Sequence, residues 1–136
     1  MKRFLLCSLS LVLTTTAHAQ LPQIRITGVF PPGAQRGTTV DVTVTAGTDL
    51  DEASELVTSH PGIKAVPKQD GNGQPVANQF TLSVDPALPA GLYDLRLRGL
   101  FGVSNPRIFR IDTLPEVQEA EPNNTAEQAQ EVTLNT

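Results

Sequence analysis

Oxygen-bearing side chains cluster in two short segments of the chain, and oxygen is the ligand atom that calcium prefers. Neither segment continues into an Asp-x-Asp-x-Asp-Gly loop with a distant bidentate glutamate, the pattern of a complete calcium loop. We therefore predict two solvated loops and assign no metal ligand, with weak calcium binding as the alternative. The residues concerned are Asp49, Asp51 and Glu52 in one segment, and Asp70, Asn72 and Gln74 in the other.

Residues for nucleophilic or acid–base catalysis are scarce. His60 stands before Pro61 and Gly62, which predicts a position in a turn. A general base or a zinc site needs partners, and no cysteine follows Cys7. No serine lies in a Gly-x-Ser-x-Gly elbow, and no glycine loop for phosphate is present. We predict no catalytic residue, no cofactor-binding residue and no metal ligand, so the chain is not expected to be an enzyme.

Basic side chains are concentrated near the last predicted hairpin. If they cluster on its outer face, they form a surface for an acidic partner. The interpretation that we favour is a solvated sheet face, with cross-strand ion pairs to Asp94 or Asp112. The basic residues are Arg96, Arg98, Arg107 and Arg110.

Tyr93 is the single tyrosine of the chain, and it opens a predicted strand directly after Leu88–Gly91. This position is typical of a tyrosine corner, in which the hydroxyl bonds to the backbone a few residues upstream. We favour this role over stacking of a ligand on the ring.

The first residues predict a secretory signal peptide. Lys2 and Arg3 precede an apolar run, Phe4–Leu13, that is too short to span a bilayer as a helix, and Ala17-His18-Ala19 forms an A-x-A cleavage site. A membrane anchor is the less favoured alternative. Residues 1–19 are therefore expected to be removed, and the rest to be secreted, periplasmic or at the cell surface, without membrane attachment.

Removal of the signal peptide changes the bulk properties. The single cysteine is lost, so the core must stabilise the domain without an internal disulfide. Eight basic residues then face 14 acidic ones, a net charge of −6, which argues against nucleic acid as a partner. Much of this charge lies in a C-terminal stretch without Lys or Arg: Glu116, Glu119, Glu121, Glu127 and Glu131.

Alternation of apolar and polar residues predicts most of the strands. The inward positions are Ile24 and Ile26; Val40, Val42 and Val44; Phe80, Leu82 and Val84; and Tyr93, Leu95 and Leu97. The segment Leu50–His60 fits either a short helix or a loop followed by a strand at Glu55–Thr58, which we favour. Pro31-Pro32-Gly33 is expected to end the first strand, Gln23–Phe30. Arg107–Asp112 is expected to be an edge strand partly covered by a neighbouring domain.

About seven short strands separated by turns predict an all-β fold, an immunoglobulin-like antiparallel β-sandwich. Two stretches resemble the ends of IPT/TIG-type immunoglobulin-like domains. The first is Pro31–Val42, with a Pro-Gly loop and a Gly-Thr pair before a valine-alternating strand; the second runs from Leu88 to Leu95 and resumes at Gly102–Pro106. The resemblance covers about residues 22–114 and implies the fold more than a function.

The stretch Glu119–Thr125, with Ala126 and Ala129, resembles the opening of bacterial pre-peptidase C-terminal (PPC) domains. These β-sandwiches are attached to secreted peptidases and other large exported proteins, so the resemblance implies a longer protein. Asn123-Asn124-Thr125 also matches a glycosylation sequon, which we interpret as a turn.

Three regions are thus expected: a signal peptide at 1–19, an immunoglobulin-like β-sandwich at 20–114, and a disordered acidic linker with a truncated PPC-like start at 115–136. We expect a non-catalytic spacer or interaction module that contacts downstream domains or another extracellular protein. The alternatives are a polysaccharide-binding accessory module, and the N-terminal fragment of a secreted peptidase or other hydrolase. Few aromatic residues argue against the polysaccharide-binding module.

Overall fold

The computed structural model describes residues 21–51 and 53–132, so the predicted signal peptide lies outside the described residues. The described chain is all-β, as predicted, and contains no α-helix. No described helix is long and apolar enough to cross a membrane. The strands are β1 (Arg25–Phe30), β2 (Gly33–Gln35), β3 (Thr39–Thr48), β4 (Ala53–Thr58), β5 (Ile63–Gln69), β6 (Pro75–Val84), β7 (Gly91–Gly99), β8 (Gly102–Val103) and β9 (Arg107–Asp112).

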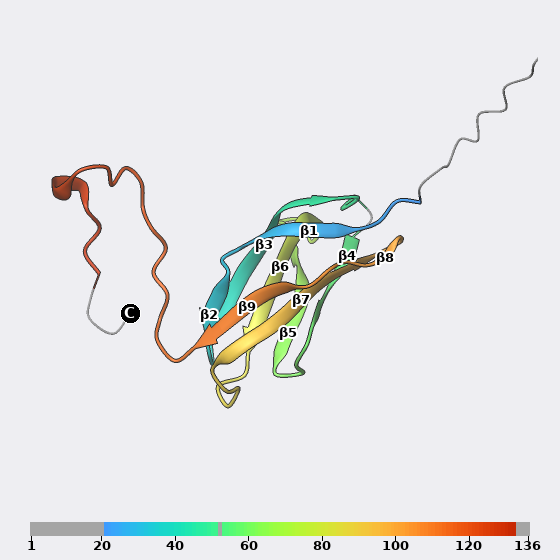
Figure 1. Ribbon diagram of the computed structural model, residues 1–136, viewed down its shortest axis with the longest axis horizontal. Helices are drawn as coiled ribbons and strands as arrows, with labels where there is room; N and C mark the ends of the chain where they lie inside the picture. The colour runs from blue at the N-terminus through green and yellow to red at the C-terminus, as the bar shows by residue number, and fades with distance from the viewer. Residues whose placement is uncertain (1–20, 52, 133–136) are drawn as a thin grey trace, which may run out of the picture.

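The strands form two sheets that pack as a β-sandwich (Figure 1). The first sheet has the order β1-β3-β6-β5, and the second has the order β2-β9-β7-β4, with β8 paired to β7. All neighbours are antiparallel except β2 and β9, which run parallel. Consecutive strands therefore often lie in opposite sheets, and the core is enclosed between them.

The predicted inward positions are confirmed. Val42, Leu82, Leu95 and Leu97 are fully buried, and Tyr93 packs partly buried against the same core. Alternation places these side chains between the sheets because successive residues of a strand point to opposite faces. Burial of each large apolar side chain contributes about 1.5–3 kcal/mol to folding.

The predicted break at Pro31-Pro32-Gly33 is confirmed, because β1 ends at Phe30. One expectation for the sheet edges is wrong, because Gly33 also begins β2, which pairs in parallel with β9. Consequently β9 is not an edge strand, because it lies between β2 and β7. This pairing joins residues far apart in sequence, and local propensity carries no information about it.

The segment Leu50–His60, which fitted either a helix or a loop and strand, forms a loop followed by a strand, as favoured. The strand β4 begins at Ala53 rather than at Glu55. Leu56 points into the core, and Glu55 and Val57 lie on the opposite face of the strand. A helix here would leave the exposed edge of β7 without its partner β4.

The segment after β8 ties the two sheets together. The buried Ser104 hydroxyl accepts a hydrogen bond from the Leu97 N–H at 2.9 Å and donates to the Asn105 carbonyl at 2.7 Å. The Asn105 side chain then takes the place of a neighbouring strand along β1. Its Oδ1 accepts from the Ile26 N–H at 3.0 Å, and its Nδ2 donates to the Ile26 carbonyl at 2.9 Å.

The chain beyond β9 leaves the sandwich and carries one short 3₁₀ turn, Ala126–Gln128, within the described residues (Figure 1). The Gln130 side chain closes this region into a loop, donating to the Gln118 carbonyl at 3.1 Å and accepting from the Ala120 N–H at 2.9 Å. No other described part of the chain after Asp112 forms a helix or strand.

Candidate functional site

Tyr93 forms the predicted tyrosine corner. Its hydroxyl donates to the Pro89 carbonyl at 2.8 Å, four residues upstream. The ring meets His60 edge-on, with centroids 5.7 Å apart and ring planes at 70°. The Nδ1 of His60 accepts a hydrogen bond from the Gly62 N–H at 3.0 Å, within the predicted turn. Both side chains therefore hold loops in place at one end of the sandwich.

The Asp70 carboxylate is engaged by its own turn. Oδ1 accepts hydrogen bonds from the backbone N–H groups of Gln74 and Asn72, each at 2.8 Å. These two bonds hold the pKa of Asp70 below its ordinary value. The Gly73 N–H completes the turn by donating to the Asp70 carbonyl at 3.0 Å. The Asp70 side chain and backbone together therefore stabilise this turn.

In the other acidic segment, the Asp49 carboxylate also accepts a backbone hydrogen bond. Asp49 has a left-handed backbone (φ 54°), and its Oδ2 accepts a hydrogen bond from the Gln23 N–H at 3.0 Å. Glu52 lies outside the described residues. Among the residues that the structure describes, no group of three or more His, Cys, Asp or Glu side chains could hold a metal ion.

The four arginines do not share one face. Arg96, Arg98 and Arg110 point outward from β7 and β9, on the outer side of the second sheet. The prediction is wrong for Arg107, which pairs with Leu95 and therefore belongs to the opposite side of the sheet. Its guanidinium donates to the Thr27 carbonyl of β1.

Each of the three outward arginines has an acidic partner. Arg98 reaches Glu55 of β4 at 2.9 Å, Arg96 lies 3.7 Å from Asp94, and Arg110 contacts Asp112. The expected acids, Asp94 and Asp112, are therefore used, but within their own strands rather than across strands. The cross-strand partner, Glu55, was not anticipated, because the start of β4 was ambiguous in sequence.

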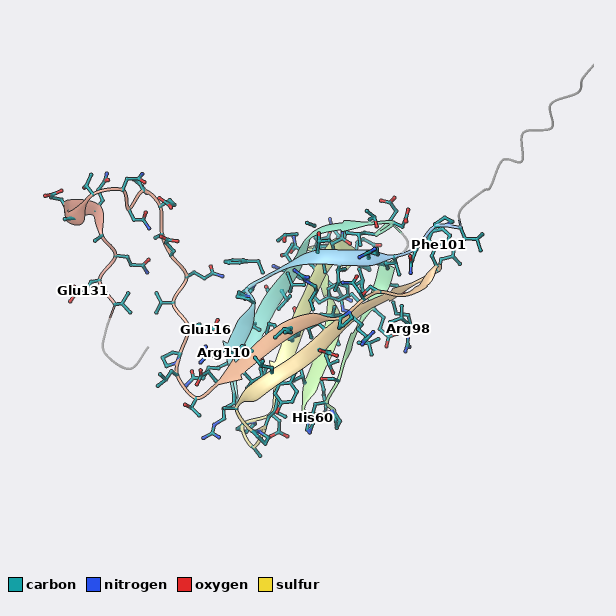
Figure 2. All side chains as sticks on the ribbon, viewed as in Figure 1. His60, Arg98, Phe101, Arg110, Glu116 and Glu131 are labelled. Atoms are coloured by element: carbon teal, nitrogen blue, oxygen red, sulfur yellow. The ribbon has the colours of Figure 1, made fainter. Side chains whose placement is uncertain are left out.

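The pKa of Asp112 lies below its ordinary value, first because of the Thr113 backbone N–H and then because of Arg110. Asp112 is consequently held as the charged partner of Arg110, at the end of β9 where the chain leaves the sandwich. Figure 2 labels Arg110 at this end and Arg98 at the other end of the same sheet.

Two large apolar side chains lie between these charges. Leu92 is 67% exposed and Ile108 is 62% exposed. They are diagonal neighbours, because Leu92 pairs with Arg110 and Ile108 pairs with Asp94. Val103 of β8, opposite Arg98, is also exposed. We call this surface the arginine face; it comprises Glu55, Val57, Leu92, Asp94, Arg96, Arg98, Val103, Ile108, Arg110 and Asp112.

The exposed position of Ile108 follows from its parity in β9. Phe109 and Ile111 share one parity and are buried, whereas Ile108 and Arg110 share the other parity and point outward. An isoleucine on the solvent side of a strand that is buried on its other side is the signal for an exposed apolar position.

A groove of about 550 Å³ lies at the end of the sandwich where the chain leaves β9, between the bend that joins β1 to β2 and the segment Pro115–Glu119. Phe30, Pro31 and Val40 supply apolar walls, and Glu116 and Glu119 supply carboxylates. The groove brings together no pair of groups suited to nucleophilic or acid–base chemistry among its lining residues.

Comparison with known proteins assigns no relative. No protein-family model matches the chain, and no curated protein matches it in sequence.

Proposed function

We propose that this chain is a non-catalytic, exported, immunoglobulin-like spacer and interaction module, and that the arginine face is its interaction surface. The observation that carries the proposal is the exposure of Leu92 and Ile108, side by side on a sheet face whose charges are already paired. An exposed apolar patch rimmed by polar residues is typical of a protein–protein contact site.

The strand order supports the immunoglobulin-like assignment. The sheet β1-β3-β6-β5 has the A-B-E-D order of a constant-type immunoglobulin domain, and β4, β7 and β9 have its C-F-G order. Tyr93 stands near the start of the strand equivalent to F, where the tyrosine corner belongs. The valine-alternating strand and the Gly-Val-Ser-Asn-Pro segment that resemble IPT/TIG-type domains become β3 and the β8–β9 connection.

The energetics of the face suit binding. Ion pairs within the face reduce the net charge that a partner must desolvate, and the apolar side chains between them contribute about 25 cal/mol per Å² when covered. Interfaces commonly combine an apolar centre with a polar rim and are enriched in arginine. The arginine face has this composition.

The proposed location is outside the cytoplasm, on the basis of the predicted signal peptide. The resemblance of Glu119–Thr125 to the opening of PPC domains supports attachment to a longer exported protein, whose following domains are proposed contacts of this module.

Site-specific photo-crosslinking in the producing cells tests the proposal. A photo-crosslinking amino acid in place of Ile108 is expected to give a defined crosslinked species. The matched control replaces Val66, which is 57% exposed on β5 of the other sheet, and is expected to give none. Crosslinking from neither position, or equally from both, would contradict the assignment of the face.

A glycan array tests the module class separately. The purified protein is expected to show no saturable binding to any polysaccharide. Saturable binding that survives Ile108→Ser would overturn the proposal in favour of a carbohydrate-binding module.

A further inference from the structure

We propose that the arginine face binds a second copy of the same chain, with the two β7 strands antiparallel and Asp94 of each copy opposite Arg96 of the other. The inference rests on the proposed function, because it names the partner of the same face. It follows from the order of charges along β7 and from the place of the apolar residues beside them.

The outward residues of β7 are, in order, Leu92, Asp94, Arg96 and Arg98. Successive outward residues of a strand lie about 6.8 Å apart. A two-fold contact uses the same patch on both copies. If the two-fold axis crosses β7 between Asp94 and Arg96, each of these residues meets its opposite charge, and two new ion pairs form across the interface.

The alternative two-fold arrangement is unfavourable. An axis running along β7 would place Asp94 against Asp94 and Arg96 against Arg96 of the second copy. Like charges that face each other across an interface are strongly unfavourable and exclude this arrangement. The charge order therefore selects the antiparallel arrangement.

The same axis also places the apolar residues well. Leu92 meets Arg98 of the second copy, whose aliphatic stem can cover it while the guanidinium stays with Glu55. Ile108 meets the exposed Pro106, which directly precedes β9 and is two residues before Ile108. Leu92 and Ile108 are thus both covered by residues of the second copy.

An acidic partner fits the face less well. Its three arginines are matched by three carboxylates, so the face carries no surplus positive charge that an acidic surface would neutralise. The carboxylates are Glu55, Asp94 and Asp112. A face that carries charges of both signs instead favours a surface that presents them in the reverse order, and the second copy related by the two-fold axis supplies that surface.

Sedimentation velocity of the full chain, over roughly a hundredfold range of concentration, tests the inference. The wild-type protein is expected to pass from monomer to dimer. Asp94→Arg and Arg96→Asp are each expected to weaken the dimer about tenfold or more, and the double variant is expected to restore it to within about threefold. The control swap, Asp41→Lys with Lys68→Asp, exchanges an ion pair on the other sheet and is expected to change nothing.

Two results would overturn the inference: a monomer at every concentration, or a double variant that associates as weakly as the single variants. Thermal unfolding of each variant establishes that it is folded. A monomeric wild-type protein that still crosslinks from position 108 removes the second copy as partner and leaves the proposed function standing. A monomeric wild-type protein that gives no crosslink from position 108 would also contradict the proposal that the arginine face is an interaction surface.

Discussion

The two outer faces of the sandwich are both formed by strands that bury one side and expose the other, yet the exposed side chains differ between the two faces. On the sheet β1-β3-β6-β5, paired rows of short polar side chains face solvent, with Asp41 bonded to Thr81 at 2.7 Å and to Lys68 at 2.9 Å. We call this surface the threonine face; it comprises Thr39, Asp41, Thr43, Lys64, Val66, Lys68, Gln79, Thr81 and Ser83.

Exposed apolar residues occur on both faces but are arranged differently. On the sheet of the threonine face, Phe30 and Val66 lie on the two edge strands, β1 and β5, with β3 and β6 between them. On the arginine face, Leu92 and Ile108 lie on adjacent paired strands. A sheet tolerates isolated exposed apolar side chains without consequence, whereas a contiguous pair indicates a contact surface. The contrast therefore depends on position within the sheet rather than on composition.

The largest expected effect tests the alternation on which both faces depend. Val42→Asp places a carboxylate at a fully buried position, and we expect the variant not to fold. Asp41→Val, one residue earlier on the outer side of β3, is expected to fold with a change within about 1 kcal/mol. Circular dichroism melting distinguishes them; a Val42→Asp variant as stable as wild type would mean that the inner and outer faces have been confused.

The next effect concerns the connection between the sheets. Asn105→Ala removes both side-chain partners of the Ile26 backbone. We expect a loss of about 1–3 kcal/mol in the free energy of unfolding, because a part-buried N–H and carbonyl lose their bonds. Urea unfolding measures this loss. An unchanged midpoint would show that the Asn105 side chain does not contribute to holding β1 against the second sheet.

Tyr93→Phe has a smaller expected effect. The variant keeps the ring against the core and loses the bond to the Pro89 carbonyl, so about 1 kcal/mol is expected in urea unfolding. The dimer constant is expected to stay the same, since Tyr93 points away from the arginine face. A larger change in association than in stability would move the contact surface to the Tyr93–His60 end.

The smallest effect concerns pH. The Lys68 side chain, and then Thr81, hold the pKa of Asp41 below its ordinary value of 3.8. A lowered pKa in the folded state contributes stability above that value and loses it as the pH falls through the lowered pKa. We therefore expect Asp41→Asn to show a slightly shallower loss of stability below about pH 4 in acid unfolding curves. A steeper loss in the variant would contradict the role of this pair on the threonine face.

Local sequence patterns predicted the features that depend on residues close together along the chain. The alternation of Val40, Val42 and Val44 placed β3 and its inward face, and Leu88–Tyr93 identified the tyrosine corner. The parallel pairing of β2 with β9 could not be predicted in this way, because Gly33 and Arg110 are distant in sequence.

The candidate site was predicted in part. The arginines and two of their acidic partners were identified, but Arg107 was assigned to the wrong side. Apolar residues occupy both parities of β9, with Phe109 buried and Ile108 exposed, so its inward face could not be read from hydrophobicity alone. The register with β7 decides it, and register depends on non-local pairing.

Backbone NMR spectra recorded over roughly a hundredfold range of protein concentration test the central claim most directly, because each amide reports on its own face. The account predicts concentration-dependent shifts at Leu92, Asp94, Arg96 and Ile108, and none at Asp41, Thr43 or Thr81. Shifts confined to the threonine face, or no shift at any strand residue at the highest concentration, would contradict it.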